Sequence, residues 1–201
     1  MQFNTLDIIT TVLGLAYILF EYRASAWMWI VGIVMQLLGI VLYYQKGLYA
    51  DCGMEFYYLS VSFYGLWQWV AKPKQAPKGE KTSDIWSVFS LPSMWPVVWM
   101  LSGMVALWML IYWLLVTFTD STVPLADSFT TALSLLGVWA LAHKMLEQWL
   151  VWIVVDVVSS VLYATKGLPF KSGLYALYVV IAVLGYFRWR RLAQMSSKPR
   201  M

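Results

Sequence analysis

The sequence predicts an all-α integral membrane protein with seven transmembrane helices, and three observations lead to this prediction. Apolar residues make up 61% of the 201 residues and charged residues only 12%, whereas soluble domains contain about 45–50% and about 25%. The apolar residues gather in runs of about 20, the length that crosses a bilayer as a helix. The third observation is an internal repeat, in which the pattern of the first three runs recurs in the last three.

The spans follow from the length of the apolar runs and the polar residues that interrupt them. They cover residues 5–21, 26–45, 48–70, 93–118, 125–143, 147–165 and 171–190. The expected domains are a first three-helix repeat at 1–70, a basic linker with linker helix at 71–124, a second three-helix repeat at 125–191 and a basic cytoplasmic tail at 192–201.

The repeat has an offset of 120 residues, at which Lys46-Gly47-Leu48 meets Lys166-Gly167-Leu168. Further matches are Trp29 with Trp149, Gln36 with Asp156, Tyr58 with Tyr178, Gly65 with Gly185 and Trp69 with Trp189. An offset of four helices keeps both copies in the same orientation, with the fourth span as an inverting linker. Such a parallel 3+1+3 arrangement is a transporter design, with the substrate site between the repeats.

The positive residues lie between and after the spans and predict the orientation of the chain. Of the 14 Lys and Arg residues, three fall on one side of the seven predicted spans and eleven on the other. Cytoplasmic loops carry the excess of Lys and Arg, so the N-terminus is expected outside and the C-terminus inside. The formal charge of +4 is therefore no indication of nucleic-acid binding.

Several classes of protein are excluded by what the sequence contains. Its single cysteine, Cys52, rules out a disulfide framework or a cysteine metal site, and its single histidine, His143, rules out a multi-histidine site. The sequence contains no nucleophile–base pair or hydrolase motif that would indicate an enzyme. It also contains no Walker motif that would indicate ATP binding. We expect neither a cofactor nor a metal.

The second repeat carries the sharpest candidate site. Trp149, Trp152 and Asp156 are spaced three and four residues apart, on one face of a helix. Indoles attract and stack on cationic rings, and the carboxylate supplies the opposite charge. Tyr178, in the last span, is a further candidate lining residue. The alternative is that the tryptophans are interface anchors and that Asp156 bonds to a neighbouring helix.

The first repeat offers a second set of polar residues inside its spans. Glu55, Tyr58 and Ser62 lie on one face of the third span, and Trp29 and Gln36 lie on the second. Ionisable groups within a bilayer are costly and usually functional, so Glu55 is expected to meet water, a proton or a cationic ligand. An amide such as Gln36 also forms ordinary interhelical bonds.

The residues resemble those of the PnuC vitamin-transporter family over nearly the whole chain. The matching segments are Leu48-Tyr49-Ala50, Tyr64-Gly65 with Trp69, Asp127-Ser128, Glu147 to Trp152 with Asp156, and Lys166-Gly167. The resemblance implies a SWEET-like seven-helix fold that carries a vitamin precursor across the bacterial inner membrane. It also implies facilitated diffusion, in which intracellular phosphorylation traps the substrate.

The expected substrate follows from departures from the nicotinamide riboside pattern of that family. Met35, Glu55, Ser62, Asp156 and Leu184 stand where amide side chains are expected. The exchange of amides for carboxylates favours thiamine, which has a cationic ring and an aminopyrimidine. Nicotinamide riboside, also a cation, is the alternative, and a sugar carrier or a non-transporting sensor or scaffold comes next. The expected partners are the vitamin and the lipid bilayer, and a homo-oligomer stays open.

Overall fold

The computed structural model describes residues 5–45, 49–70, 85, 87, 95–119, 123–165 and 169–197, and these residues form seven helices. They are α1 (Thr5–Tyr22), α2 (Trp27–Gln45), α3 (Tyr49–Val70), α4 (Trp95–Phe118), α5 (Pro124–Ala142), α6 (Gln148–Thr165) and α7 (Pro169–Ser197). Each coincides with one predicted span. The ends agree closely except that of α7, which continues past residue 190, because its polar C-terminal residues end an apolar run without ending a helix.

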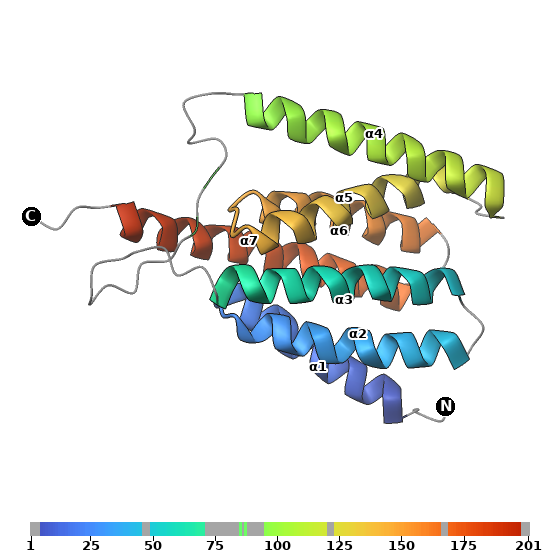
Figure 1. The fold of residues 1–201 in the computed structure, drawn as a ribbon, viewed down its shortest axis with the longest axis horizontal. Coiled ribbons are helices and arrows are strands. Elements are labelled where there is room, and N and C mark those ends of the chain that lie inside the picture. The colour runs from blue at the N-terminus through green and yellow to red at the C-terminus, as the bar shows by residue number, and fades with distance from the viewer. Residues whose placement is uncertain are drawn as a thin grey trace, which may run out of the picture. The chain divides into compact units, whose positions relative to one another are not determined.

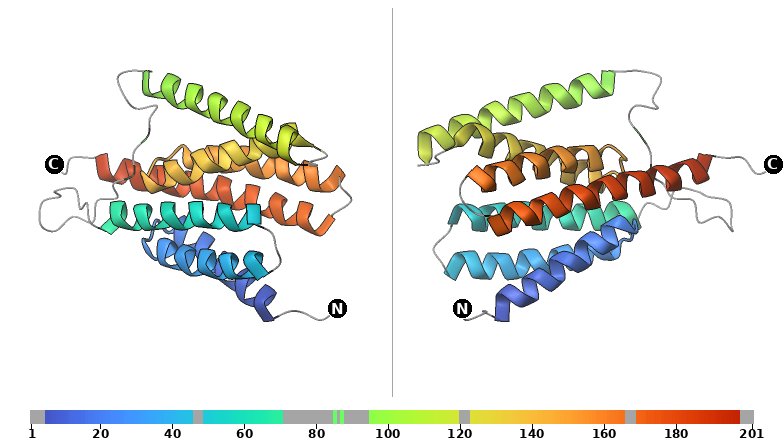
Figure 2. Two further views of the ribbon diagram at one scale, coloured as in Figure 1. Left: turned by 45° about the vertical axis from the view of Figure 1, so that its right-hand side comes forward. Right: turned by 180° about the vertical axis from the view of Figure 1, so that it is seen from behind.

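Helix packing divides the chain into two compact units, Met1–Lys81 and Thr82–Met201. In the first unit α2 packs against both α1 and α3 (Figure 1). In the second unit α4 packs against α5, α5 against α6, and α6 against α7 (Figure 2). The indole N–H of Trp108 donates a hydrogen bond of 3.1 Å to Ser128 Oγ and joins α4 to α5. Most of the basic linker and both Lys-Gly-Leu segments lie outside the described residues, and the predicted domain boundaries stay predictions.

The turns that follow α1 and α5 have the same backbone hydrogen bonds at the offset of 120. Ala24 and Lys144 both adopt a left-handed backbone, with φ of 52° and 57°. The N–H of the next residue, Ser25 or Met145, reaches back five residues, to the carbonyl of Phe20 at 2.9 Å or of Ala140 at 3.0 Å. The left-handed residue itself bonds three residues back, at 2.9 Å in both turns. These bonds define a Schellman motif, which satisfies the last carbonyls of the helix.

A tryptophan is packed on a glycine in the same way in each unit. A Cβ built on Gly65 would lie 2.5 Å from the ring of Trp29, and one built on Gly185 would lie 2.6 Å from the ring of Trp149. Each ring also meets a second indole edge-on: Trp69 at 6.1 Å and 76°, and Trp189 at 5.7 Å and 82°. Only glycine admits an indole this close to the backbone, so this packing fixes the position of α3 on α2 and of α7 on α6.

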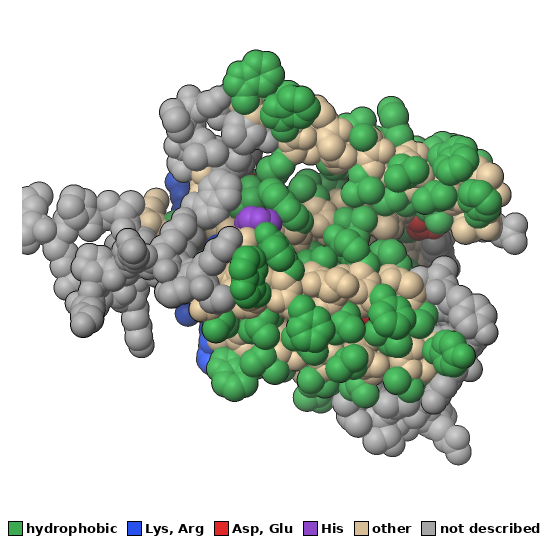
Figure 3. Space-filling model, viewed as in Figure 1, with side chains coloured by type: hydrophobic (Ala, Val, Ile, Leu, Met, Phe, Trp, Pro, Cys, Tyr) green, Lys and Arg blue, Asp and Glu red, His purple; other side chains and the backbone are tan. Residues whose placement is uncertain are grey.

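The outer surface of the described helices is apolar, as in membrane proteins. Among the described residues, four segments are long and apolar enough to span a bilayer: Val97–Phe118, Pro124–Ala142, Gln148–Thr165 and Ser172–Gln194. Along α4, the side chains of Trp95, Trp99 and Phe118 are 68%, 72% and 70% exposed. Figure 3 shows apolar side chains over much of the described surface. Exposed apolar area on this scale exceeds what soluble monomers usually show and is typical of helices that cross a membrane.

Candidate functional site

The polar residues of the first unit converge on two glycines of α2. Glu55, from α3, lies across Gly39, where a Cβ would stand 2.7 Å from its carboxyl carbon. About two turns earlier on α2, Ser62 from α3 and Tyr17 from α1 both contact Gly32, where a Cβ would lie 3.3 Å from each. Ser62 is only 4% exposed. Helices α1 and α3 therefore both bring polar side chains to the face of α2 that carries these two glycines.

The other candidates of the first unit differ in their surroundings. Tyr58 lies within electrostatic range of both Glu55 and Tyr17, so the three side chains form one polar group. Gln36 is half-buried on α2, between Gly32 and Gly39. Trp29, in contrast, is 1% exposed and held between Gly65 and Trp69. Its surroundings are those of a packing residue.

The contact at Gly39 leads to a prediction about stability. Gly39→Ala places a methyl group against the carboxyl group of Glu55, and crowding of this kind costs about 1–3 kcal/mol. We expect a lower thermal unfolding temperature in detergent, and recovery in the Gly39→Ala/Glu55→Ala double variant, which removes the obstructing side chain. Gly53→Ala is the matched control, because no atom lies within 4 Å of the added Cβ. Equal effects at both glycines would contradict this placement of Glu55.

The two tryptophans of the second unit pack against different helices. Trp149, 3% exposed, lies against Gly185 and Trp189 of α7. Trp152 instead lies against α5, where a Cβ on Gly137 would be 3.3 Å from its ring. The shared spacing along α6 therefore sends one indole toward each neighbouring helix. Trp152 is half-buried and keeps part of its surface available.

The contact of Trp152 reverses one seen in the first unit. There the ring comes from α1, as Tyr17, and the glycine from α2, as Gly32. At the offset of 120 these positions become Gly137 on α5 and Trp152 on α6. The ring and the glycine have exchanged helices. Each pair of helices therefore keeps a contact between an aromatic ring and a glycine, while α6 gains an indole that α2 lacks.

Asp156 lies beside a group of tyrosines from α6 and α7. Its side chain is 6% exposed and within electrostatic range of Tyr175 and Tyr178. Tyr175 stacks on Tyr163, with ring centroids 5.2 Å apart at 16°, and meets Tyr178 edge-on at 5.8 Å. Aromatic faces next to a carboxyl group suit a cationic ring. Tyr163 was missed in the sequence, although its spacing of seven from Asp156 places it on the same helix face.

Two further polar residues at the start of α6 were also missed as candidates. Glu147 accepts a hydrogen bond from Ser87 Oγ, which joins Ser87 to the α5–α6 turn. Gln148 has no exposed surface, and neither amide atom has a hydrogen-bond partner in the described part of the chain. The sequence does hold a signal for Gln148: it lies four residues before Trp152 and so shares a helix face with it.

Comparison with known proteins gives consistent matches. The family model described as nicotinamide mononucleotide transporter matches residues 4–191. The riboflavin/roseoflavin transporter RibM of Streptomyces davaonensis is 25% identical over 195 residues, 96% of this chain and 88% of that protein. The nicotinamide riboside transporter PnuC of Neisseria mucosa is 24% identical over 200 residues, 94% of this chain and 73% of that protein.

The PnuC protein of Escherichia coli is likewise 24% identical, over 169 residues that make up 74% of this chain and 70% of that protein. Among solved structures, the crystal structure of the vitamin B3 transporter PnuC superposes with a TM-score of 0.72. The alignment covers 96% of this chain and 83% of that one, at 21% identity. At this identity the likeness shows a shared fold.

Proposed function

Because this chain belongs to the nicotinamide mononucleotide transporter family, whose model matches residues 4–191, we propose that it carries a vitamin precursor with an aromatic ring across a membrane. The observation that carries the proposal is the buried carboxyl group of Asp156 within α6, beside Tyr175 and Tyr178. A carboxyl group buried in a membrane helix is costly unless it has a functional partner. A cationic substrate supplies such a partner.

Nicotinamide riboside is the leading substrate. Relatives along most of the chain are named nicotinamide riboside transporters, and another is named a riboflavin/roseoflavin transporter. The comparisons therefore support nicotinamide riboside better than thiamine, which was the first expectation from the sequence. The pyridinium ring can lie against the half-buried indole of Trp152, and the ribose hydroxyls can donate to Asp156.

Thiamine is the second candidate, because Glu55 of α3 and Asp156 of α6 place a carboxyl group well inside a helix of each unit. Glu55 lies against Gly39 in the first unit and Asp156 beside the tyrosines in the second. Either carboxyl group could balance the thiazolium charge or bond to the aminopyrimidine. Gln36, Tyr58 and Ser62 belong to the same unit as Glu55 and would orient a substrate bound there.

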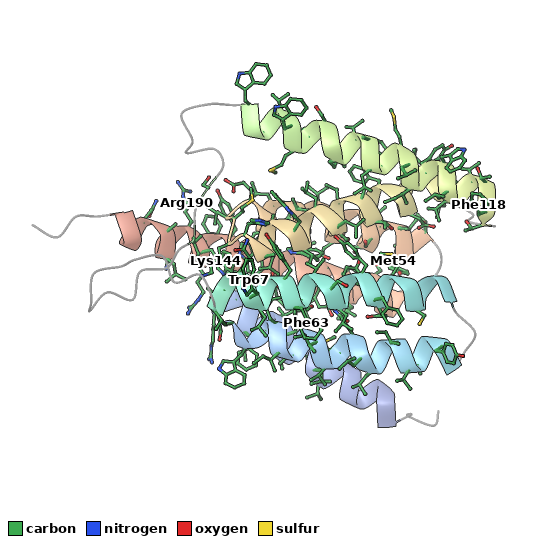
Figure 4. The ribbon with its side chains drawn as sticks, viewed as in Figure 1. Met54, Phe63, Trp67, Phe118, Lys144 and Arg190 are labelled. Carbon is green, nitrogen blue, oxygen red and sulfur yellow. The ribbon has the colours of Figure 1, made fainter. Side chains whose placement is uncertain are left out.

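The proposed architecture is a parallel pair of three-helix repeats, α1–α3 and α5–α7, joined by α4. The matched Schellman turns and the matched tryptophan–glycine contacts support this arrangement. Alternating movement of the repeats would give facilitated diffusion. The bacterial inner membrane is the proposed location, with the N-terminus periplasmic and the C-terminus cytoplasmic. Figure 4 shows Lys144 and Arg190 at the same end of the second unit, opposite Phe118, as positive residues on one membrane face require.

Uptake by purified full-length protein in proteoliposomes tests the function. We expect labelled nicotinamide riboside to exchange with unlabelled substrate inside the vesicles, without an ion gradient or ATP. Riboflavin and thiamine are measured in parallel, and vesicles without protein are the control. Exchange of thiamine alone would favour the second candidate. If folded, reconstituted protein exchanged none of the three, a sensor or scaffold would replace the transporter.

A further inference from the structure

Helix α6 differs from its counterpart α2 on one face, at three successive turns. At the offset of 120, Met28, Gly32 and Gln36 of α2 correspond to Gln148, Trp152 and Asp156 of α6. Residues four apart share a helix face. The turns that lead into the two helices have the same backbone hydrogen bonds, so the backbone does not require these changes. Each change adds an amide, an indole or a carboxyl group.

Gln148 is the least expected of the three. Both Gln148 and Met28 have 0% of their surface exposed, so the two side chains occupy equally buried positions. They are close in length and volume, and Met28 shows that an apolar side chain fills such a position. The amide of Gln148 has no hydrogen-bond partner among the described residues. A buried amide without partners destabilises a protein, which calls for an explanation other than packing.

The indole N–H groups of α6 separate into two kinds. Those of Trp149 and Trp152 both lack a partner in the described part of the chain, but so does that of Trp29, the counterpart of Trp149. The unpaired N–H of Trp149 therefore belongs to the common packing on glycine. The N–H of Trp152 has no such counterpart, because Gly32 has no side chain. The groups particular to α6 are thus Gln148, Trp152 and Asp156.

We propose that Gln148 determines specificity by binding a neutral planar group that both donates and accepts hydrogen bonds, namely the primary carboxamide of the substrate. This inference rests on the proposed function. The side-chain NH₂ of Gln148 donates to the carboxamide oxygen, and its Oε1 accepts from the carboxamide NH₂. A carboxylate in the same place has no proton to donate and turns its negative charge toward Oε1.

The order of the three residues fits one ligand lying along α6. Successive members are four residues apart, about 6 Å along the helix. The carboxamide meets Gln148, the pyridinium ring lies on Trp152 next to it, and the ribose hydroxyls donate to Asp156 one turn further. Gln148 has no exposed surface here, so the ligand reaches it in the arrangement that alternating access opens.

The test compares nicotinamide riboside with its carboxylate analogue, nicotinic acid riboside, in exchange assays with full-length protein. The wild type is expected to prefer the carboxamide by about tenfold to 100-fold, the factor that a lost hydrogen-bonded pair produces. Gln148→Met, which copies the residue at position 28, is expected to lose this preference through a higher KM for nicotinamide riboside. Its thermal unfolding temperature in detergent should equal or exceed that of the wild type.

The controls separate this inference from the proposed function. Met28→Leu changes the equivalent position in the first unit and should leave the preference intact. If Gln148→Met were more stable but kept the preference, Gln148 would be only a buried amide and the inference would fall. Equal transport of carboxamide and carboxylate by the wild type, or transport of riboflavin or thiamine alone, would also overturn it while leaving vitamin transport in place. No exchange of any compound would instead reject the proposed function.

Discussion

Asp156→Ala is expected to reduce uptake of nicotinamide riboside by about 100-fold, because loss of one partner from a buried charged pair costs about 2–5 kcal/mol. The carboxyl group is 6% exposed and lies beside Tyr175 and Tyr178. The two tyrosines carry hydroxyl groups but no negative charge that could replace that of Asp156. Most of the effect should therefore appear as a loss of substrate affinity.

Initial rates of exchange over a range of substrate concentrations measure this effect. Asp127→Ala is the matched control, since it removes a second carboxyl group from the same unit, in the first turn of α5. The thermal unfolding temperature of both variants shows whether folding is intact. If a folded Asp156→Ala protein took up substrate like the control, Asp156 would have no part in the site.

Trp149→Ala and Trp29→Ala are each expected to lower the free energy of unfolding by about 3–5 kcal/mol, as large aromatic truncations in cores do. Both rings are almost fully buried, at 3% and 1% exposure. Each fills the space above a glycine and meets a second indole edge-on. Removal leaves a cavity that the neighbouring helix cannot close without moving. Equivalent packing predicts losses of similar size.

Thermal denaturation of the purified variants in one detergent compares these losses. Trp99→Ala, on the outer face of α4 with 72% of its side chain exposed, is the control and should have a much smaller effect. Binding by the folded fraction then separates two roles for Trp149. A loss of affinity in Trp149→Ala alone would support ring stacking as well as packing. Stability equal to that of Trp99→Ala would contradict the packing on Gly185.

The helices and the family were predictable from the sequence, because hydropathy directly reflects the environment of each span. The predicted span at 147–165 and the observed α6, Gln148–Thr165, differ by one residue. The resemblance to the PnuC family is confirmed by the match over residues 4–191. The predicted end of α7, at residue 190, was wrong for a physical reason. The charged residues that follow end the apolar run, but the backbone remains helical to Ser197.

The candidate site was less predictable, since spacing along a helix gives a face but not the neighbour that covers it. Trp149 and Trp152 share spacing with Asp156, yet one ring lies on Gly185 and the other near Gly137. Gln148 went unnoticed because glutamine at the start of a helix is ordinary, and only its burial makes it unusual. The choice of thiamine rested on carboxyl groups that serve any cationic vitamin.

The paired Schellman turns also bear on how the chain enters the membrane during synthesis. Only four residues separate α1 from α2, and the backbone groups of Arg23, Ala24 and Ser25 bond back into the end of α1. Unpaired backbone groups are what make passage into hydrocarbon costly. When the backbone groups of the turn are already paired in this way, we expect the two helices to enter the membrane together as a hairpin. The α5–α6 hairpin has the same closure, so each half of the chain would be laid into the bilayer around a ready-made helical pair.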